Sequence, residues 1–523
     1  MGYRRACVGV VVLSWALSFA AGAQVTTARV SGGQVEGTAA NGVAAFKGIP
    51  FAAPPVGDLR WKKPQPVIAW SGVKKTNAYA PACVQDPNML RFIGATDTTA
   101  SEDCLYLNVW TPAKSASERL PVMVWIYGGG FAAGATNSPT YDGTRLAEKG
   151  VVLVSVAYRV GPFGFLAHPE LSKESGKGSG TYGLQDMIAG LEWVKANAAA
   201  FGGDARNVTI FGESAGGIAV SMLGASPAAK GLFAKAISES GGNFAPLRTG
   251  AEGGQQTPTL AVAEQAGANL FAKLGVKSLA EARKVSAEEV QKALPPGLGG
   301  GFWPTADGDV LPGDQYVLYS QGKFNDTPVL IGTNSDEGAS FSRGGTTSAA
   351  YEKMIRDGYG RGADEILAAN PHSSDADAAT ATKNIMRDSL FAWSTWAWAR
   401  LQSSKGRGAA YVYYFDHRTP QTPNGAPHAS ELRYVFRTLD GRDGTPRPED
   451  TAMSELVSSY WVNFAKTGDP NGARLPKWPA FTESAQQAMV FDTASSARPM
   501  PNRAQLEALD AYYAWRREQA RHP

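Results

Sequence analysis

The stretch NVTIFGESAGG at residues 207–217 decides the fold class of this chain. Its first five residues form a β-branched and aromatic run that is typical of a buried strand. The turn GESAGG at 212–217 follows, and an apolar run at 215–223 predicts a helix. Glycines flank Ser214 because backbone segments approach so closely in such a strained turn that a side chain would clash. The helix then directs its free N–H groups and positive end at Ser214, which favours a negative oxygen there.

A G-x-S-x-G pattern between a strand and a helix is typical of a serine nucleophile. The pattern is loose by itself, however, and the alternative is a serine that merely lies in a glycine-rich turn. Around this pattern, apolar strand-like runs alternate with helical patterns. Further strands are expected at 122–127, 151–158, 233–238 and 327–333, and a helix over 183–200. This alternation predicts an α/β fold with a central, mostly parallel sheet and helices on both faces. Two stretches, 249–310 and 342–408, interrupt the rhythm and are predicted to be helical insertions beside the sheet.

The second of these stretches carries an aromatic stripe. Trp393, Trp396 and Arg400 recur at i, i+3 and i+7, so they share one face of a helix. Such a stripe could line a ligand cleft, but aromatic stripes on helices more often belong to the core. We therefore predict a core role.

The N-terminus predicts export. Met1-Gly2-Tyr3-Arg4-Arg5 is cationic, the run to about Ala20 is apolar, and Ala21-Gly22-Ala23 resembles a cleavage site. A membrane anchor is the alternative, but the apolar run is shorter than a spanning helix needs. We expect residues 1–23 to be a signal peptide, so that the mature chain begins at Gln24 in a periplasmic or extracellular compartment. The arginine pair leaves Sec or twin-arginine export open.

Charge and residue counts exclude several classes of partner. Without the leader, 48 basic residues face 47 acidic ones, which gives no electrostatic reason to bind nucleic acid or an anionic membrane. Cys83 and Cys104 remain after cleavage, and an oxidising compartment favours their pairing. The five histidines have no metal-binding spacing, so we expect neither a metal nor another cofactor.

Eight separated motifs reveal a family resemblance. They are FKGIPFAAPPVGDLRW (46–61), SEDCLYLNVWTP (101–112), VWIYGGGF (124–131), YRVGPFGF (158–165), FGGDARNVTIFGESAGG (201–217), TNSDEG (333–338), GAPHASEL (425–432) and NFAKTGDPN (463–471). With them the chain resembles the type-B carboxylesterases, the esterase and cholinesterase branch of the α/β-hydrolases. The resemblance implies one catalytic domain over 24–523 that hydrolyses small-molecule carboxylic esters without a cofactor.

The resemblance also implies a catalytic triad. Ser214 is the expected nucleophile, His428 in GAPHASEL the base, and Glu337 in DEG the acid that orients the base. Their order along the chain is the one this fold uses. The alternatives are a loop histidine satisfied by backbone for His428, and Asp336 in place of Glu337.

The same resemblance implies which backbone groups stabilise the negative oxygen that forms when the serine attacks an ester. Gly129, Gly130 and Ala215 are expected to supply N–H groups, since glycine lets the backbone approach a substrate. The glycines at 299–301 are expected to form only a turn. Tyr127 replaces the histidine that many lipases carry before these glycines, and tyrosine also occurs there in this branch.

Two further residues are expected near the triad. Ser240 in SESG matches a family serine that hydrogen-bonds near the triad, and Glu213 matches a buried family carboxylate. Either could be purely structural.

Two departures from the family pattern bear on specificity. Cholinesterases carry a tryptophan in the corresponding disulfide loop that holds the choline cation. Residues 84–103 contain none, and Phe92 is their only aromatic residue, so a choline ester is not the expected substrate. In the histidine motif, Ala429 and Arg433 replace the usual glycine and proline, and Arg433 could favour acidic or polar substrates or be a surface charge.

Two other functions remain as alternatives at the level of sequence. An inactive binding protein could share the fold, but such members lose triad residues that this chain keeps. An amidase or a lactonase could use the same triad. Neither the natural ester nor the oligomeric state follows from the sequence.

Overall fold

A long mixed sheet runs through the residues that the computed structural model describes, which are 24–250, 256–295, 301–439 and 445–521. It has 11 strands within this part of the chain. In spatial order they are β16 (Ser496–Pro499), β15 (Gln487–Phe491), β14 (Ala410–Phe415), β13 (Val329–Asn334), β12 (Lys235–Glu239), β11 (Gly203–Glu213), β9 (Leu120–Ile126), β10 (Val152–Val156), β8 (Tyr106–Thr111), β4 (Val43–Pro50) and β3 (Thr38–Ala40).

The centre of the sheet is parallel and its edges are antiparallel. Every neighbouring pair from β10 to β15 is parallel, whereas β16 and the β8-β4-β3 edge pair antiparallel. The residues of β10 are all buried, as expected for a strand covered on both faces. The predicted mostly parallel sheet is therefore confirmed. The strand predicted at 207–211 covers only the apolar part of β11, which begins at Gly203 and ends at Glu213.

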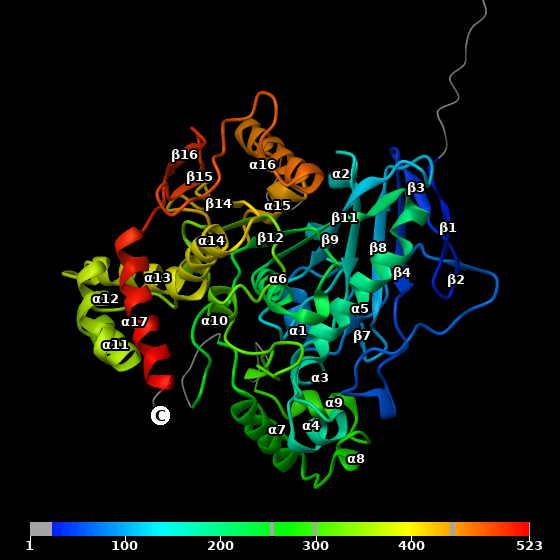
Figure 1. Cartoon of the computed structure of the whole chain (residues 1–523), viewed down its shortest axis with the longest axis horizontal. Coiled ribbons are helices and arrows are strands. Elements are labelled where there is room, and N and C mark those ends of the chain that lie inside the picture. Colours follow the sequence, from blue (N-terminus) through cyan, green and yellow to red (C-terminus); the bar gives the residue numbers. More distant parts are fainter. Residues whose placement is uncertain (1–23, 251–255, 296–300, 440–444, 522–523) are drawn as a thin grey trace, which may run out of the picture.

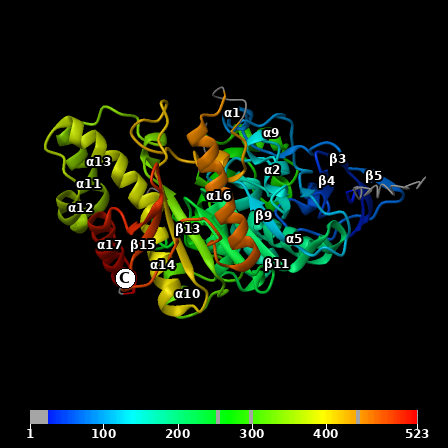
Figure 2. The same ribbon diagram turned by 90° about the horizontal axis from the view of Figure 1, so that it is seen from above.

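Two helical layers cover the sheet (Figures 1 and 2). One contains α5 (Tyr182–Asn197), α6 (Ala215–Ala225), α10 (Gln315–Ser320) and α14 (Trp393–Lys405). The other contains α2 (Thr144–Ala147), α15 (Leu432–Val435) and α16 (Pro448–Thr467). The helix predicted at 183–200 is α5, with a 3-10 turn at its end.

The remaining helices lie around this core. Below the sheet in Figure 1 are α3 (Gly161–Phe165), α4 (Pro169–Ser175), α7 (Leu260–Leu274), α8 (Leu279–Ala282) and α9 (Ala287–Lys292). At the left end are α11 (Ser348–Tyr359), α12 (Ala363–Ala369), α13 (Asp375–Arg387) and α17 (Arg503–Arg521). The prediction for 342–408 needs a correction, because its last helix, α14, packs on β13 and β14 instead of lying beside the sheet. Gly299 and Gly300 lie outside the described residues.

The aromatic stripe of α14 belongs to the core, as predicted. Trp393 and Trp396 are fully buried. Trp393 donates through its indole N–H to Asp510 at 3.2 Å, and the Arg400 guanidinium lies 4.5 Å from the Trp396 ring. These contacts attach α14 to its neighbours, so the stripe serves packing.

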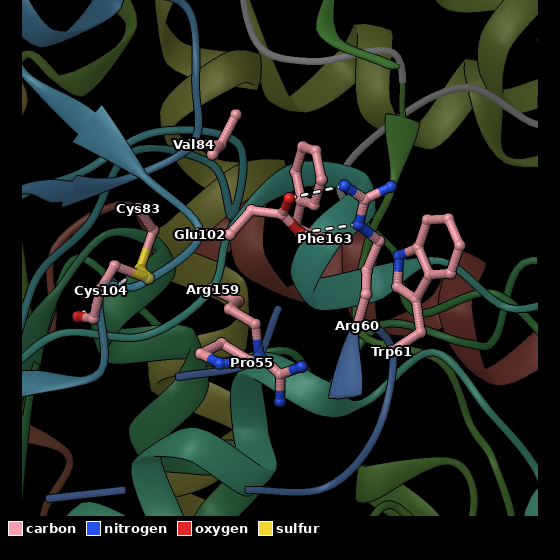
Figure 3. Close-up of a pocket in the computed structure, with 9 residues that line it drawn as sticks. All are labelled: Pro55, Arg60, Trp61, Cys83, Val84, Glu102, Cys104, Arg159 and Phe163. Carbon is pink, nitrogen blue, oxygen red and sulfur yellow. Dashed lines mark hydrogen bonds and ion pairs between the residues drawn. A yellow bond between two sulfur atoms is a disulfide. The ribbon is translucent and has the colours of Figure 1, made fainter. Parts of the chain in front are cut away.

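The N-terminal part adds small sheets and the disulfide. A three-stranded sheet contains β1 (Thr27–Val30), β2 (Gly33–Glu36) and β5 (Val73–Lys75), and β6 (Ala82–Cys83) pairs with β7 (Ala100–Ser101). Cys83 is bonded to Cys104, as expected. Beside the disulfide, Nη2 and Nε of Arg60 donate to the Glu102 carboxylate at 2.6 and 2.7 Å (Figure 3). The predicted signal peptide, residues 1–23, lies outside the described residues.

Candidate active site

The candidate site residues gather because they follow neighbouring parallel strands. β9, β11, β12, β13 and β14 all end at the same edge of the sheet. The order of strands in the sheet also switches sides here, because β10 is added on one side of β9 and the next strand in the chain, β11, on the other. Ligands of open α/β sheets bind at this kind of switch point.

Ser214 occupies a strained turn between β11 and α6. Its φ is 54° and ψ is −125°, a backbone conformation that non-glycine residues rarely adopt. Its N–H donates to Glu239 O at 2.9 Å, which fixes the turn against the next strand. A Cβ on Gly216 would lie 2.0 Å from Ile126 O, so only glycine lets α6 start this close to β9. The side chain of Ser214 makes no capping hydrogen bond to α6.

Glu337 and His428 meet in a direct contact. Glu337 lies in the 3-10 turn after β13, and its Oε2 is 2.5 Å from Nδ1 of His428. The neighbouring Asp336 instead faces Lys383, at 4.0 Å. Of the two acids, the structure therefore brings Glu337 to the histidine.

Three donors surround the Glu337 carboxylate. Ser240 Oγ and the Asn334 N–H donate to Oε1 at 2.5 and 2.7 Å, and His428 meets Oε2. These contacts fix the orientation of the carboxyl group. Ser240 thus contacts the acid directly. The contact of Glu337 with the backbone of Asn334, the last residue of β13, was not predicted from the sequence.

His428 also faces Glu213. Its Nε2 lies 3.1 Å from Glu213 Oε1, so the ring is held between two carboxyl groups. Burial disfavours the imidazolium, but the negative charges of Glu213 and Glu337 outweigh this effect and raise the pKa of His428 to about 9. The Nε2 contact with Glu213 is an ion-pair distance only, since Glu213 Oε1 has no hydrogen-bond partner within the described residues.

Two aromatic rings contact the imidazole. Phe391 stacks on it at 4.6 Å and 18°, and Phe341 lies at 5.0 Å. Phe391 belongs to a π-helix, Asp388–Ala392, inserted between α13 and α14. Single π turns often occur at functional sites. A buried ion pair between Arg387 and Asp388 starts this turn, at 2.8 Å. The sequence had no signal for this packing, because Phe391 and His428 are 37 residues apart in the chain.

A group of buried carboxyl groups lies behind the turn. Glu213, Glu239 and Glu431 are buried, and each has one oxygen without a hydrogen-bond partner in the described part of the chain. Burial raises the pKa of Glu213 to about 7 and that of Glu431 to about 8, and raises that of Glu239 as well. Because these three groups are buried close to one another, some of them hold protons at neutral pH. The roles of Glu239 and Glu431 were missed, although both stand inside quoted motifs.

The glycines after β9 adopt positive φ values, which glycine accommodates without strain. Gly129 and Gly130 have φ of 109° and 63°. A Cβ on Gly129 would lie 2.4 Å from Ala133 O, and one on Gly128 would lie 3.0 Å from the Ser214 Cβ. This glycine turn therefore passes directly beside Ser214. Ala215 is the first residue of α6, where a helix N–H has no acceptor within the helix.

Of the residues that depart from the family pattern, Ala429 directly follows His428 and has a φ of 64°. Phe92, at the end of α1 (Pro87–Phe92), is 77% exposed. Arg433 on α15 donates to Leu439 O at 2.7 Å. Within the described residues, no group of three or more His, Cys, Asp or Glu could hold a metal ion. No helix of the described part is long and apolar enough to cross a membrane.

The fold and the site define a class of protein. A central parallel sheet with covered faces, a serine in a strained strand–helix turn and a histidine–carboxylate pair at the same edge are the features of an α/β-hydrolase. Comparisons with known proteins agree. Residues 22–509 match the model of the carboxylesterase family. This chain belongs to the carboxylesterase family, and it is a carboxylic ester hydrolase.

Individual relatives support the assignment. The chain is 38% identical to the fumonisin B1 esterase of Sphingopyxis macrogoltabida, over 88% of this chain and 85% of that protein. It is 37% identical to the para-nitrobenzyl esterase of Bacillus subtilis (strain 168), over 88% and 94%. A solved structure of a PNB esterase superposes with a TM-score of 0.82 at 35% identity, covering 93% of this chain and 99% of that one.

Proposed function

We propose that this ester hydrolase works by two-step acyl transfer through Ser214, His428 and Glu337. The observation that carries the proposal is the Glu337–His428 contact of 2.5 Å at the sheet edge where Ser214 occupies its strained turn. His428 Nε2 takes the proton of Ser214 Oγ as this oxygen attacks the ester carbonyl. The same proton then passes to the departing alcohol, and water activated by His428 releases the acid.

Backbone N–H groups complete the proposed mechanism. Those of Gly129, Gly130 and Ala215 would stabilise the negative oxygen of the tetrahedral intermediate. Glu337 would hold the imidazole in one tautomer and balance its charge, and Ser240 would keep Glu337 in place. Glu213 would also take part, because its negative charge beside Nε2 would control how readily His428 loses a proton.

The test of this proposal is Ser214→Ala. The variant should lose at least ~10³-fold in kcat with p-nitrophenyl acetate. Its far-UV circular dichroism should match that of the wild type, because the side chain makes no capping bond. A folded variant with a near wild-type rate would refute the assignment and favour a binding protein whose hydrolysis is incidental.

We also propose that the enzyme does not prefer choline esters. The support is the disulfide loop 84–103, which has no tryptophan and whose one ring, Phe92, is solvent-exposed. An aromatic face gives a desolvated quaternary ammonium about 2 kcal/mol, or roughly 30-fold. We expect less than a tenfold difference in kcat/KM between butyrylcholine and its uncharged isostere, 3,3-dimethylbutyl butyrate. A larger preference for the cation would contradict the proposal, and Phe92→Ala would then show whether Phe92 supplies it.

Export completes the proposal. The cationic, apolar and A-x-A segments of residues 1–23 support a cleaved signal peptide, and the Cys83–Cys104 bond suits an oxidising compartment. The intact mass of the protein recovered outside the cytoplasm of its native host should correspond to a chain that begins at Gln24. A mass that retains residues 1–23 would contradict cleavage.

A further inference from the structure

A pair of tyrosines holds the start of the glycine turn that follows β9. The backbone oxygen of Tyr127, the residue before the turn, accepts a hydrogen bond from the Tyr158 hydroxyl at 2.8 Å. In return, the Tyr127 hydroxyl donates to Tyr158 O and accepts from the Tyr158 N–H, at 2.9 and 3.1 Å. Both rings are buried, and they stack at 4.3 Å. The start of the turn is therefore fixed against the segment that follows β10.

The far end of the turn, Gly134, is held by a side chain from the disulfide loop. Gln85 lies two residues after Cys83, and its amide meets both backbone polar groups of Gly134. Nε2 donates to Gly134 O and Oε1 accepts from the Gly134 N–H, each at 2.8 Å. Within the described residues these are the only hydrogen bonds of the Gly134 backbone. The position of Gly134 thus depends on Gln85.

Gln85 itself is anchored to the disulfide. Its Nε2 also donates to Cys83 O at 2.9 Å, and Cys83 is bonded to Cys104 (Figure 3). Because Gln85 is only 3% exposed, its hydrogen bonds are shielded from water. Leu90 of the same loop packs in a small buried cluster with Ala135, the residue after Gly134. The disulfide loop therefore supports the far end of the glycine turn.

The turn is compact enough to transmit a displacement of Gly134. A Cβ on Gly134 would lie 2.1 Å from the Tyr127 ring and 2.7 Å from Gly128 O. Gly129 O accepts the N–H of Ala133 at 3.0 Å, which closes the turn on itself. Since packed backbone leaves no free space here, a shift of Gly134 also moves Gly128 and Gly129.

We propose that Gln85 is a positioning residue for the oxyanion donors. It acts through Gly134, and by holding that residue it keeps the N–H groups of Gly129 and Gly130 aimed at the developing negative oxygen. The inference rests on the proposed role of these two glycines in ester hydrolysis. It gives the disulfide loop a part in the rate of the reaction.

Gln85→Met tests this role, because methionine has nearly the size of glutamine but cannot make these hydrogen bonds. Oxyanion donors act mainly in the transition state. With p-nitrophenyl acetate, kcat should therefore fall about tenfold while KM changes less than about twofold. If Gln85→Met does not fold, Gln85→Asn gives the same test, since its amide is one methylene shorter and cannot reach both polar groups of Gly134.

Asn137→Leu is the matched control. Asn137 is a second buried amide, three residues beyond Gly134, and its Nδ2 donates to Asp97 O of the same disulfide loop at 2.9 Å. Both substitutions remove a link between the two segments, so both should lower the Tm. Asn137→Leu should nevertheless leave kcat within about twofold of the wild type, because Asn137 does not bind the glycine turn.

Inhibition by 2,2,2-trifluoroacetophenone locates the effect at the oxyanion. By the proposed mechanism, Ser214 Oγ bonds to the carbonyl carbon, the carbonyl electron pair passes to oxygen, and His428 takes the serine proton. The adduct carries the oxyanion that the backbone donors stabilise. Its Ki should rise about tenfold in Gln85→Met, in parallel with the loss of kcat, and stay within about twofold in Asn137→Leu.

Three results would overturn the proposal. They are a wild-type kcat in folded Gln85→Met, equal losses of kcat in Gln85→Met and Asn137→Leu, and a loss of kcat without a rise in Ki. Absence of inhibition of the wild type would instead count against the proposed serine mechanism. In that case the kcat values of the two amide variants still decide whether Gln85 acts on hydrolysis.

Discussion

Two histidine–carboxylate pairs lie near the carboxyl ends of the central strands, and they differ in their surroundings. His428 meets Glu337 through Nδ1, and His417 meets Asp450 through Nε2. Asp450 is neutralised by the Arg447 guanidinium, whereas Glu337 is held by the neutral donors Ser240 and Asn334. The negative charge of Glu337 is therefore available to a developing imidazolium, and that of Asp450 is already balanced.

The surroundings of the second ring nitrogen also differ between the two pairs. Nε2 of His428 lies 3.1 Å from Glu213, the neighbour of Ser214, whereas Nδ1 of His417 has no hydrogen-bond partner within the described residues. A histidine–carboxylate contact by itself therefore does not define a catalytic base. The two pairs differ in the charge around the acid and in the group beside the second nitrogen.

The largest predicted effect separates the two histidines directly. His428→Gln should lower kcat/KM for p-nitrophenyl acetate by at least ~10³-fold, because the proton of Ser214 then has no acceptor. His417→Gln, the matched variant, should change kcat/KM less than threefold, since no triad residue contacts His417. Both rates are measured on variants that elute and unfold as single species. Comparable losses in the two variants would show that the pairs are not functionally distinct.

The next prediction concerns the second carboxylate at His428. The neutral imidazole is the active base, so kcat/KM rises as pH increases through the pKa of His428. Glu213→Gln removes a negative charge that stabilises the imidazolium, so this pKa should fall and the rise should move to lower pH by about one unit. A pH profile of kcat/KM between pH 5 and 10 measures the shift. Glu192→Gln, an exposed acid on α5, should leave the profile in place, and a shift of Glu213→Gln to higher pH would contradict the argument.

The smallest predicted effect concerns the aromatic rings at His428. Phe391→Leu removes the stacked ring and should lower kcat about fivefold while KM stays nearly constant, because the imidazole loses a contact that fixes its orientation. Phe92→Leu, at the exposed end of α1, is the control and should have no effect. If Phe391→Leu raises KM alone, Phe391 contacts substrate instead of positioning the base.

Local patterns were sufficient for much of the fold. The run NVTIFGESAGG predicted a strand, a tight turn and a helix because apolar periodicity and glycine placement are properties of neighbouring residues. The same reasoning located β9, β10, β12 and β13, and the motifs around residues 337 and 428 singled out the two side chains that meet at 2.5 Å. The small N-terminal sheet was not predicted, since its strands are short and mostly polar.

Contacts between distant residues were decided only by the tertiary structure. Glu239 and Glu431 lie 192 residues apart, and no local pattern shows that both turn inward behind Ser214. The stack of Phe391 on His428 depends on one π turn, and the contact between Gln85 and Gly134 joins residues that are 49 positions apart. The sequence by itself therefore determined the elements and the reactive residues, because these follow from short-range sterics and burial. Their electrostatic surroundings required the fold, because charge and solvent exclusion depend on whatever packs nearby, however far away in the chain.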